Sequence, residues 1–292
     1  MTYRMDICVV IVSCNSGAAL SACLDSLLIQ ADSGMEITVT DNGSSDGSIE
    51  ALKAAHGGIR FIQNKVNLGA AQARNQAIAL SKGEWVLTLD SDIVLDRGFI
   101  KAFKELRPKL TLNVGMVRPN ILTEDGSKIY SHGIYLTPIK RFYDYDKGLP
   151  AGYNGKRINE VVGPCSAAAF YKRDMLESVR QGSGYFDRRF FFLVEDVDMA
   201  WRCQDAGWSS LYCPSAVCYH KGGSFPAGKR MRQYLSYRNR KLMIEKNGPL
   251  KIHPAHKLLE ICYRSFRFIY LFMFNRYVRM DSYPEDILRP KI

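Results

Sequence analysis

The chain has 292 residues, of which 47% are hydrophobic and 24% are charged, as in an ordinary folded protein. This length suffices for one large α/β domain, or for one domain with an extension. The eight cysteines form no CxxC pair and lie mostly within apolar runs, so we expect a reducing compartment and no zinc site. No uninterrupted apolar run is long enough to cross a bilayer, and the short run at residues 7–12 favours a strand over a secretory signal.

The net charge of +11 is distributed unevenly. Residues 1–220 hold equal numbers of acidic and basic side chains, whereas residues 221–292 carry the whole positive excess. A neutral body with a basic tail indicates a tail directed at a surface, and it argues against a nucleic-acid enzyme.

The first part of the chain alternates strand and helix patterns. Continuous apolar runs predict buried strands, and apolar residues at helical spacing predict the helices between them. The predicted strands are residues 7–12, 37–40, 59–62 and 85–89, and the predicted helices are residues 18–29, 49–55 and 70–80. Repeated β-α-β units predict a parallel sheet with right-handed crossovers.

The second part of the chain is less regular. Its predicted strands are residues 116–119, 128–137, 161–171, 211–213 and 217–219, with an amphipathic helix at residues 197–206. From Lys229 onward the pattern is helical, with two helices separated near Asn247-Gly248-Pro249. We therefore predict an α/β domain over residues 1–225, with halves at about 1–110 and 111–225, and a basic helical extension over residues 226–292.

Two carboxylates, Asp90 and Asp92, follow the predicted strand at residues 85–89. At strand spacing, residues i and i+2 point to the same side, so both can present oxygen atoms at the carboxyl edge of the sheet. Such hard ligands suit Mg²⁺ or Mn²⁺, which keep positions open for substrate phosphates. The same pattern would also arise from a helix N-cap followed by an acid that the helix dipole favours.

A second acidic cluster, Glu195, Asp196 and Asp198, follows the aromatic run at residues 190–192. Three acids within four residues resist ionising together in a partly dry site, so the pKa of one carboxyl should rise. A raised pKa suits a carboxyl that takes the proton of a hydroxyl group. The alternative is a common acidic first turn of a helix, with Asp198 paired to Arg202.

Five short motifs occur in a fixed order along the chain. They are residues 10–15 (VIVSCN), 40–47 (TDNGSSDG), 67–75 (NLGAAQARN), 89–92 (LDSD) and 191–198 (FFLVEDVD). This series resembles the inverting nucleotide-sugar glycosyltransferases of the large second family, which have a GT-A fold with a Rossmann-like, mostly parallel sheet flanked by helices. The resemblance covers roughly residues 7–220, and an ordered series is more specific than any single motif. Arg238-Asn239 resembles the rhamnosyltransferase-like branch in particular.

The resemblance implies an active site that uses Mn²⁺ or Mg²⁺. It assigns Asp92 as a direct metal ligand, with His220 reaching the metal or the diphosphate. Asp90 would touch the ribose or the sugar of the donor. Asp196 is the implied general base for the acceptor hydroxyl, and Glu195 is the next candidate.

Other residues are assigned to the two substrates. The residues expected to bind the nucleotide-sugar donor are Ser13, Asn15, Asp41, Asn67, Gly69, Arg74, Asn75, Asp90 and Ser91. Those expected on the acceptor side are Gly163, Ser166, Asp187 and Arg238. The alternatives are structural, since Ser13, Asn15 and Asp41 could cap helices or form turns, and Arg74 could face solvent from its helix.

The C-terminal segment contains seven consecutive apolar residues, 268–274, bracketed by Arg264, Arg267, Arg276 and Arg279. This pattern favours a helix lying in a membrane interface, with its arginines among anionic head groups. The alternative is a helix packed on the catalytic domain or on a second subunit, and a homo-oligomer stays open. The expected location is the cytoplasm, peripheral at the inner face of the cell membrane.

These patterns together predict an inverting glycosyltransferase of surface polysaccharide synthesis. It would move a sugar from a dTDP- or UDP-sugar, with dTDP-rhamnose as the candidate donor, to a hydroxyl of a glycan or lipid-linked oligosaccharide. Two other classes stay open: a non-catalytic scaffold with a glycosyltransferase-like fold, and a metal-dependent nucleotidyltransferase. The scaffold should have lost an acidic motif, and the nucleotidyltransferase should carry a basic, glycine-rich phosphate loop after the first strand, where residues 13–19 contain one glycine and no lysine or arginine.

Overall fold

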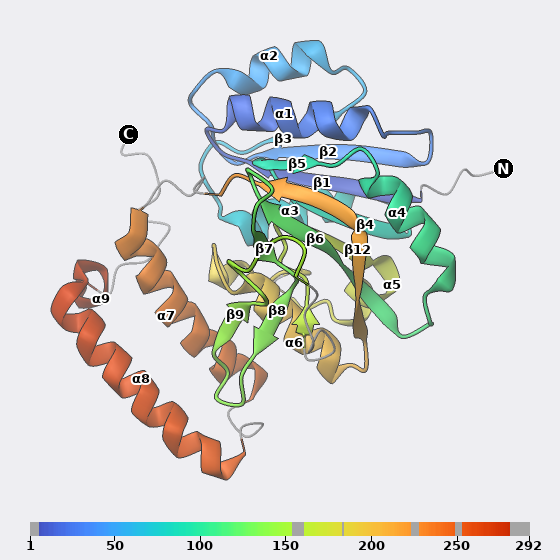
Figure 1. Cartoon of the computed structure of the whole chain (residues 1–292). Coiled ribbons are helices and arrows are strands. Elements are labelled where there is room, and N and C mark those ends of the chain that lie inside the picture. Colours follow the sequence, from blue (N-terminus) through green and yellow to red (C-terminus); the bar gives the residue numbers. More distant parts are fainter. Residues whose placement is uncertain (1–5, 154–160, 183, 223–227, 249–252, 281–292) are drawn as a thin grey trace.

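A mixed nine-stranded sheet forms the centre of the computed structural model, which describes residues 6–153, 161–182, 184–222, 228–248 and 253–280 (Figure 1). The strands are β1 (Ile7–Ser13), β2 (Met35–Asp41), β3 (Arg60–Gln63), β4 (Trp85–Asp90), β5 (Ile93–Leu95), β6 (Val114–Thr123), β7 (Ile129–Ser131), β8 (Ile134–Leu136), β9 (Phe142–Asp144), β10 (Val161–Gly163), β11 (Ala168–Lys172) and β12 (Ser209–His220). Their order in the main sheet is β3-β2-β1-β4-β11-β6-β12-β5, with β7 beside β6, and β10-β8-β9 form a second, small sheet.

The first four strands of the sheet are parallel, as the repeated β-α-β pattern predicted. Strand β11 joins them to the rest of the sheet, because it pairs antiparallel with both β4 and β6. Strand β12 then runs parallel to β6 and antiparallel to β5. This arrangement brings the ends of β4 and β12, which are far apart in sequence, to the same side of the molecule.

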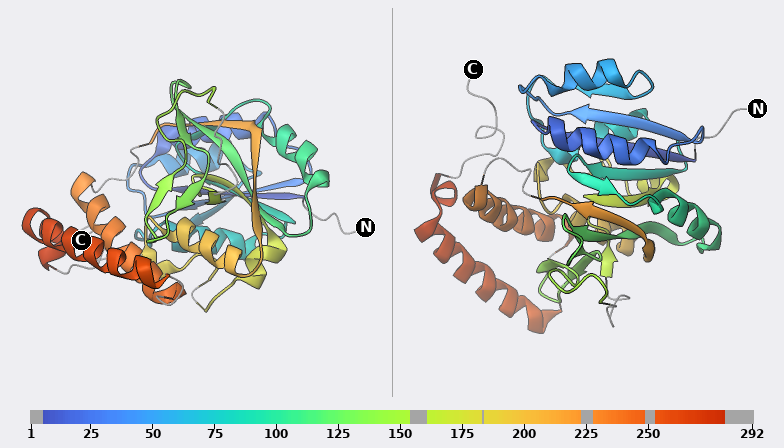
Figure 2. Two further views of the ribbon diagram at one scale, coloured as in Figure 1. Left: turned by 60° about the horizontal axis from the view of Figure 1, so that its bottom comes forward. Right: turned by 45° about the horizontal axis from the view of Figure 1, so that its top comes forward.

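The helices cover both faces of the sheet (Figure 2). They are α1 (Gly17–Leu28), α2 (Ser48–Ala55), α3 (Ala70–Leu80), α4 (Phe99–Leu106), α5 (Arg173–Ser178) and α6 (Glu195–Asp205). Strand β1 shows why the sheet is buried on both sides, since Ile7, Val9 and Ile11 pack into the core under α1 and α4, whereas Val10 packs into the core under α3 and α6.

Three further helices, α7 (Gly228–Asn247), α8 (Pro254–Phe274) and α9 (Arg276–Met280), form the C-terminal part. Helix α7 contacts α6 and the turn at residues 188–190, and α8 runs beside α7 on the side away from the sheet (Figures 1 and 2). Helix α7 ends at Asn247, where the break between the two helices was predicted. Pro249 and the predicted domain boundary at residues 225–226 lie outside the described ranges. None of the helices within those ranges combines the length and hydropathy that crossing a membrane requires.

The elements from β1 to β4 were predicted to within two residues, β5 and α4 were not predicted, and the elements of the second part were predicted less well. The strand expected at residues 128–137 is divided into β7 and β8, because His132-Gly133 turns the chain and Gly133 has a φ of 119°. The strand expected at residues 161–171 is likewise divided into β10 and β11. Conversely, residues 211–213 and 217–219 belong to one strand, β12, with a register shift between Cys213 and Val217.

Candidate active site

Polar residues end three neighbouring strands at one edge of the sheet. Ser13 lies opposite Asp41 in the pairing of β1 with β2, and Val12 lies opposite Asp90 in the pairing of β1 with β4. The carboxyl edge of the parallel strands therefore collects these polar side chains, as the sequence predicted. The N-terminus of α3 and the loop before α6 face the same edge and enclose a pocket there.

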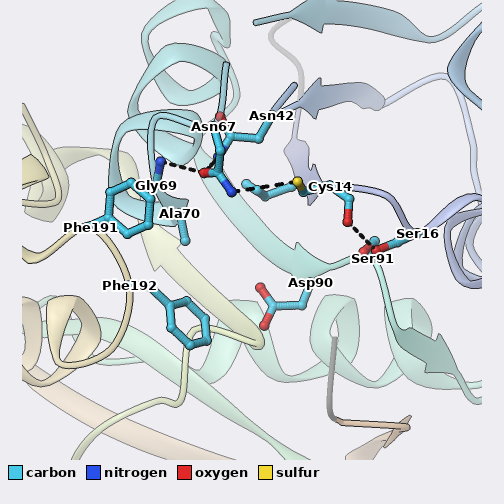
Figure 3. Close-up of a pocket in the computed structure, with 11 residues that line it drawn as sticks. Cys14, Ser16, Asn42, Asn67, Gly69, Ala70, Asp90, Ser91, Phe191 and Phe192 are labelled. Atoms are coloured by element: carbon cyan, nitrogen blue, oxygen red, sulfur yellow. Dashed lines mark hydrogen bonds between the residues drawn. The ribbon is translucent and has the colours of Figure 1, made fainter. Parts of the chain in front are cut away.

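This pocket has an empty volume of about 540 Å³ (Figure 3). It is lined by Val12, Cys14, Ser16, Asn42, Asn67, Gly69, Ala70, Asp90, Ser91, Phe191 and Phe192. The side-chain oxygen of Asn67 accepts hydrogen bonds from the Asn42 amide at 2.8 Å and from the Gly69 N–H at 2.9 Å. These bonds tie the loops after β2 and β3 to the start of α3 and so shape one wall.

Gly69 allows that wall to approach the opposite one. Its φ is 84°, and a Cβ placed there would lie 2.6 Å from the carbonyl oxygen of Phe191. At Gly69 the start of α3 therefore approaches closely the loop that carries Phe191 and Phe192 into the pocket.

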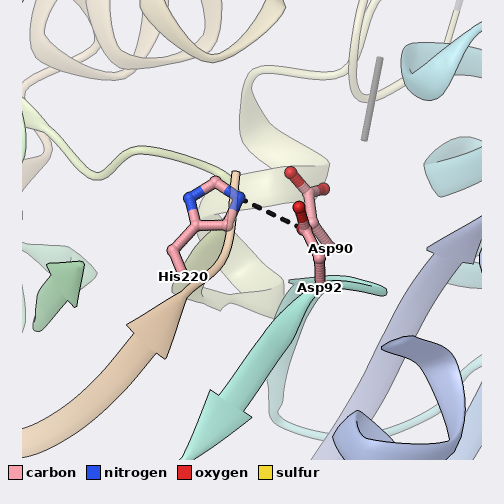
Figure 4. Close-up of side chains that lie close together, drawn as sticks. All are labelled: Asp90, Asp92 and His220. Carbon is pink, nitrogen blue, oxygen red and sulfur yellow. Dashed lines mark hydrogen bonds and ion pairs between the residues drawn. The ribbon is translucent and has the colours of Figure 1, made fainter. Parts of the chain in front are cut away.

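Asp90, Asp92 and His220 form a candidate metal site beside this pocket (Figure 4). Each residue offers one ligand atom, and these atoms lie within 4.8 Å of one another. His220 Nε2 is 3.1 Å from Asp92 Oδ1, and its buried Nδ1 has no hydrogen-bond partner in the described part of the chain. Two carboxylates and an imidazole fit Mn²⁺ or Mg²⁺, and the site combines the carboxylate pair expected from strand spacing with His220, which the resemblance implied.

A buried arginine connects the metal site to the second acidic cluster. Arg74 on α3 donates to Asp90 Oδ1 at 2.6 Å and to Glu195 Oε1 at 2.7 Å, and its side chain is only 3% exposed. Burial alone would lower the pKa of Arg74, but the charges of Asp90 and Glu195 outweigh it and raise this pKa. Arg74 is therefore a permanent cation that holds the two carboxylates in place, and its predicted contact with the donor stays a prediction.

Asp196 has the properties expected of a general base. Burial, and secondarily the neighbouring Glu195 charge, raise the pKa of its carboxyl to about 7, which confirms that one acid of the cluster has a raised pKa. Its Oδ2 accepts a hydrogen bond from the Ser166 N–H at 3.2 Å, and its Oδ1 accepts one from the Val197 N–H at 2.8 Å. Burial also raises the pKa of Glu195, although the Arg74 charge opposes this effect. Glu195 is buried, whereas Asp196 keeps access to solvent.

The loop before α6 is held in an uncommon conformation. Phe191, Leu193 and Val194 have φ values of 62°, 68° and 76°, which are unfavourable for residues with a side chain. Asn239 on α7, which is fully buried, donates to the carbonyl oxygens of Phe190, Phe192 and Leu193 at 2.7, 2.9 and 2.8 Å. Sequence reasoning did not assign this role, although an asparagine in the middle of a long helix is a signal, since it favours helix ends.

Helix α7 also neutralises the charges behind the acidic cluster. Asp198 accepts from Arg202 at 2.9 Å, as predicted, and from Lys246 at 2.7 Å. Lys246 and Arg189 pair with Asp187 at 3.1 and 2.6 Å. Burial would raise the pKa of Asp187, but these partners outweigh it and hold that pKa well below its usual range. A contact of Asp187 with the acceptor stays a prediction.

The remaining predicted residues lie around the pocket or support its walls. Asn67, Gly69, Asp90 and Ser91 line it. Asn15 Oδ1 accepts from the Ser45 N–H at 2.8 Å in the neighbouring exposed loop, and the Asn75 side-chain amide binds both the N–H and the C=O of Phe186. Arg238 donates to the Arg189 carbonyl at 2.9 Å, and a Cβ on Gly163 would lie 2.5 Å from Ala200 Cβ, so Gly163 permits close packing on α6.

Several pocket residues were not predicted from the sequence: Cys14, Ser16, Asn42, Phe191 and Phe192. Asn42 directly follows Asp41 at a strand end, and the two phenylalanines lie three and four residues before Glu195, so their positions within two of the five motifs were the available signal. Figure 3 shows the phenylalanines across the pocket from Cys14 and Ser16.

Known proteins share both this sequence and this architecture. An N-acetylglucosaminyl-diphospho-decaprenol L-rhamnosyltransferase of Mycobacterium tuberculosis is 29% identical over 240 residues, covering 74% of this chain and 76% of that protein. A poly-beta-1,6-N-acetyl-D-glucosamine synthase of Staphylococcus epidermidis is 28% identical over 193 residues, covering 63% of this chain and 42% of that protein. The first of these matches agrees with the resemblance to the rhamnosyltransferase-like branch.

Solved structures show the same GT-A fold. The S. aureus TarS structure in complex with UDP superposes with a TM-score of 0.59 at 18% identity, covering 97% of this chain and 77% of that one. A mannosyltransferase from Pyrobaculum calidifontis, in complex with GDP-Man and Mn²⁺, gives a TM-score of 0.57 at 18% identity, covering 98% of this chain and 79% of that one. Residues 8–180 match the family described as glycosyl transferase family 2, and the chain therefore belongs to this family of glycosyltransferases.

Proposed function

We propose that this glycosyltransferase is metal-dependent and inverting, and that it transfers a sugar from a nucleoside diphosphate to a hydroxyl of a glycan or lipid-linked oligosaccharide. The observation that carries the proposal is the ion-pair chain Asp90–Arg74–Glu195. It joins the candidate metal site to the neighbour of Asp196, a carboxyl with a pKa of about 7. One rigid unit thus presents a site for a diphosphate and a base for an attacking hydroxyl.

The reaction follows from this arrangement as one displacement. The acceptor oxygen attacks the anomeric carbon while Asp196 takes its proton, and the bond from that carbon to the diphosphate oxygen breaks with its electron pair. A single displacement inverts the anomeric centre. When bound, Mn²⁺ or Mg²⁺ supplies positive charge that stabilises the departing diphosphate, and Asp90, Asp92 and His220 would hold the ion.

The side chains around the reacting atoms keep the geometry fixed. Arg74 stays protonated and bridges Asp90 and Glu195, which fixes both carboxylates beside Asp196. The Ser166 N–H orients one carboxyl oxygen of Asp196. Phe191 and Phe192 place apolar surface beside the pocket, which lowers the local dielectric and strengthens the charge interactions within it.

For the donor we propose a pyrimidine nucleoside diphosphate, with dTDP-rhamnose as the first candidate. Asp41 ends β2 at the site edge, where a carboxylate can accept hydrogen bonds from a pyrimidine or a ribose. Support for rhamnose and for a lipid-linked acceptor comes from the Mycobacterium tuberculosis relative, whose name gives both.

Thermal-shift measurements with a panel of nucleotide sugars, each with and without Mn²⁺, test this proposal. We expect the melting temperature to rise with one pyrimidine donor, and only when Mn²⁺ is present, because ligand binding stabilises the folded state by mass action. The stabilising donor is then incubated with a polyprenyl-diphosphate sugar, and the anomeric configuration of the product is determined by NMR. Donor binding that is independent of metal, or a product with retained configuration, would contradict the proposal.

A further inference from the structure

Helix α8 presents a continuous apolar face to solvent. Six of its side chains, Leu258, Ile261, Phe266, Ile269, Phe272 and Met273, are between 41% and 72% exposed. At 100° per residue they fall within one sector of about 140° on the helix surface. The four charged residues of α8, Lys257, Glu260, Arg264 and Arg267, all fall outside this sector.

The opposite side of α8 carries the polar contacts. Glu260 is buried and pairs with Arg240 on α7 at 3.1 Å, while Arg267 donates to Ser236 on α7 at 3.5 Å. Just beyond the helix, Asn275 donates to the Arg230 carbonyl at 2.7 Å. In a water-soluble protein an amphipathic helix turns its apolar side inward. Here the polar contacts hold the helix with its apolar side outward, and a contiguous exposed apolar face indicates a partner.

Charge decides between the candidate partners. Within α7, α8 and α9 the acidic residues are Glu245 and the buried Glu260, whereas Lys257, Arg276 and Arg279 are exposed around the apolar face. In a symmetric dimer through α8 the same basic rim would meet itself, and the like charges would oppose association. An anionic bilayer surface complements both the apolar face and its basic rim.

A pocket beside this face likewise combines basic and apolar side chains. It lies between α7, α8 and residue 141 of the β8–β9 connection, and it is lined by Arg141, Arg267, Gln233, Tyr263, Phe266 and Tyr270, together with Leu271. The Arg141 guanidinium lies 4.8 Å from the Tyr263 ring centroid, and Arg267 Nη1 donates to the Tyr263 hydroxyl at 2.9 Å. Two guanidinium groups beside exposed aromatic side chains suit a lipid phosphate at the depth of the head groups.

We propose that the outward face of α8 lies in the interface of an anionic lipid bilayer, with Arg141 and Arg267 contacting lipid phosphate. This surface is separate from the donor pocket and goes beyond the proposed transfer reaction. It sets the orientation of the enzyme, because α7 lies between the bilayer-facing helix and the catalytic loop.

Cys262, the one cysteine classed as exposed among the described residues, provides a probe within the apolar sector. A polarity-sensitive fluorophore attached to this thiol in the full chain should brighten and shift to shorter wavelength with phosphatidylcholine vesicles that contain phosphatidylglycerol. The Cys262→Ser protein, treated identically, gives the background from other thiols. Inorganic phosphate alone should give no response, which separates a lipid head group from a free anion.

Variants then locate the surface. Ile269→Asp with Phe272→Asp should reduce vesicle binding at least about tenfold, since charges replace the side chains that enter the interface. Arg141→Gln with Arg267→Gln should lower the preference for phosphatidylglycerol. The control is Leu112→Asp, a change at a residue that is 88% exposed far from α8, and it should leave binding unchanged.

Two results would overturn the proposal. One is an unchanged fluorophore signal with anionic vesicles. The other is a signal that grows with protein concentration in the absence of lipid, together with a dimer mass in light scattering that Ile269→Asp abolishes. The second result would assign the face to an interface between two copies of the chain.

Discussion

Asp196 is the residue on which the proposed chemistry depends most directly. Its two carboxyl oxygens each accept a backbone N–H, and the isosteric amide keeps the shape of the side chain but only one of these two hydrogen bonds. We expect Asp196→Asn to lower kcat at least about a hundredfold, because a general base typically contributes that much or more. Donor affinity, measured by calorimetry with Mn²⁺, should stay within about twofold of the parent value. Near-normal turnover would assign the base to another residue.

The raised pKa of Asp196, about 7, also predicts opposite effects of pH on activity and on stability. The base must be deprotonated, so kcat/KM should rise with pH through a limb near pH 7. Folding stability should change in the other direction. The folded state keeps the proton up to about pH 7, whereas the unfolded chain loses it near pH 3.8, so this group's contribution is lost as pH rises between these values. Asp196→Asn should therefore melt at a higher temperature than the parent at pH 8, and equal melting temperatures there would contradict the raised pKa.

Gly69 tests how tightly the two walls of the pocket fit. A methyl group at this position would collide with the Phe191 backbone, and φ is 84° there. We expect Gly69→Ala to destabilise the fold by roughly 1–3 kcal/mol in urea unfolding and to weaken donor binding. The matched control is Gly57→Ala, where an added Cβ meets nothing within 4 Å, and it should leave both measurements unchanged.

At the level of elements, α7 holds the loop before α6 in place through the side chain of Asn239. Asn239→Asp keeps the shape of the side chain but replaces the amide that donates to three carbonyl oxygens. Leaving a buried group unsatisfied costs about 1–3 kcal/mol, and the strained loop should relax. We expect kcat to fall by more than donor affinity, because the loop leads directly into the first turn of α6, which carries Asp196. Lys241→Ala, an exposed change on the same helix, is the control, and equal losses in both variants would refute this positioning role.

The sequence predicted the elements that follow simple periodicity. The apolar runs of β1, β2 and β4 and the acids at their ends were sufficient to place Asp41, Asp90 and Asp92 at one sheet edge. Strand β5 and helices α4 and α5 were not predicted, and β5 has only three residues, too few to show a period. The prediction of one strand at residues 128–137 was wrong, because the positive φ of Gly133, which the hydrophobic pattern does not reveal, turns the chain there.

The parts of the site that were not predicted depend on pairings between distant segments. Arg74 lies 121 residues from Glu195 and Asn239 lies 49 residues from Phe190, and no local pattern relates either pair. A buried arginine and a helix asparagine look like surface residues in sequence. Their roles follow only from the topology, in which α3, α6 and α7 meet at the carboxyl edge of the sheet.

For the whole molecule, the metal site joins the end of β4, in the middle of the catalytic domain, to the end of β12. Asp92 and His220 are 128 residues apart, so a ligand held by both connects two distant segments of the chain. We expect Mn²⁺ with the donor to raise the melting temperature of the entire fold, and EDTA to reverse the increase. His220→Gln should reduce this increase while leaving the melting temperature of the protein without ligands within a few degrees. An increase of the same size in the variant would remove His220 from the ligand set.

Arg240 gives α7 a mechanical connection in two directions. It pairs with Glu260 of α8 and donates to the Lys140 carbonyl at 2.9 Å. The preceding residue, Asn239, donates to carbonyl oxygens of the loop before α6. Two adjacent residues of α7 therefore connect α8 to the loop before α6. If binding to lipid raises the affinity for the nucleotide sugar by ordering this loop, thermodynamic reciprocity requires that the bound nucleotide sugar raises the affinity for lipid by the same factor. An enzyme with this coupling would bind its membrane surface most tightly while the nucleotide sugar is bound.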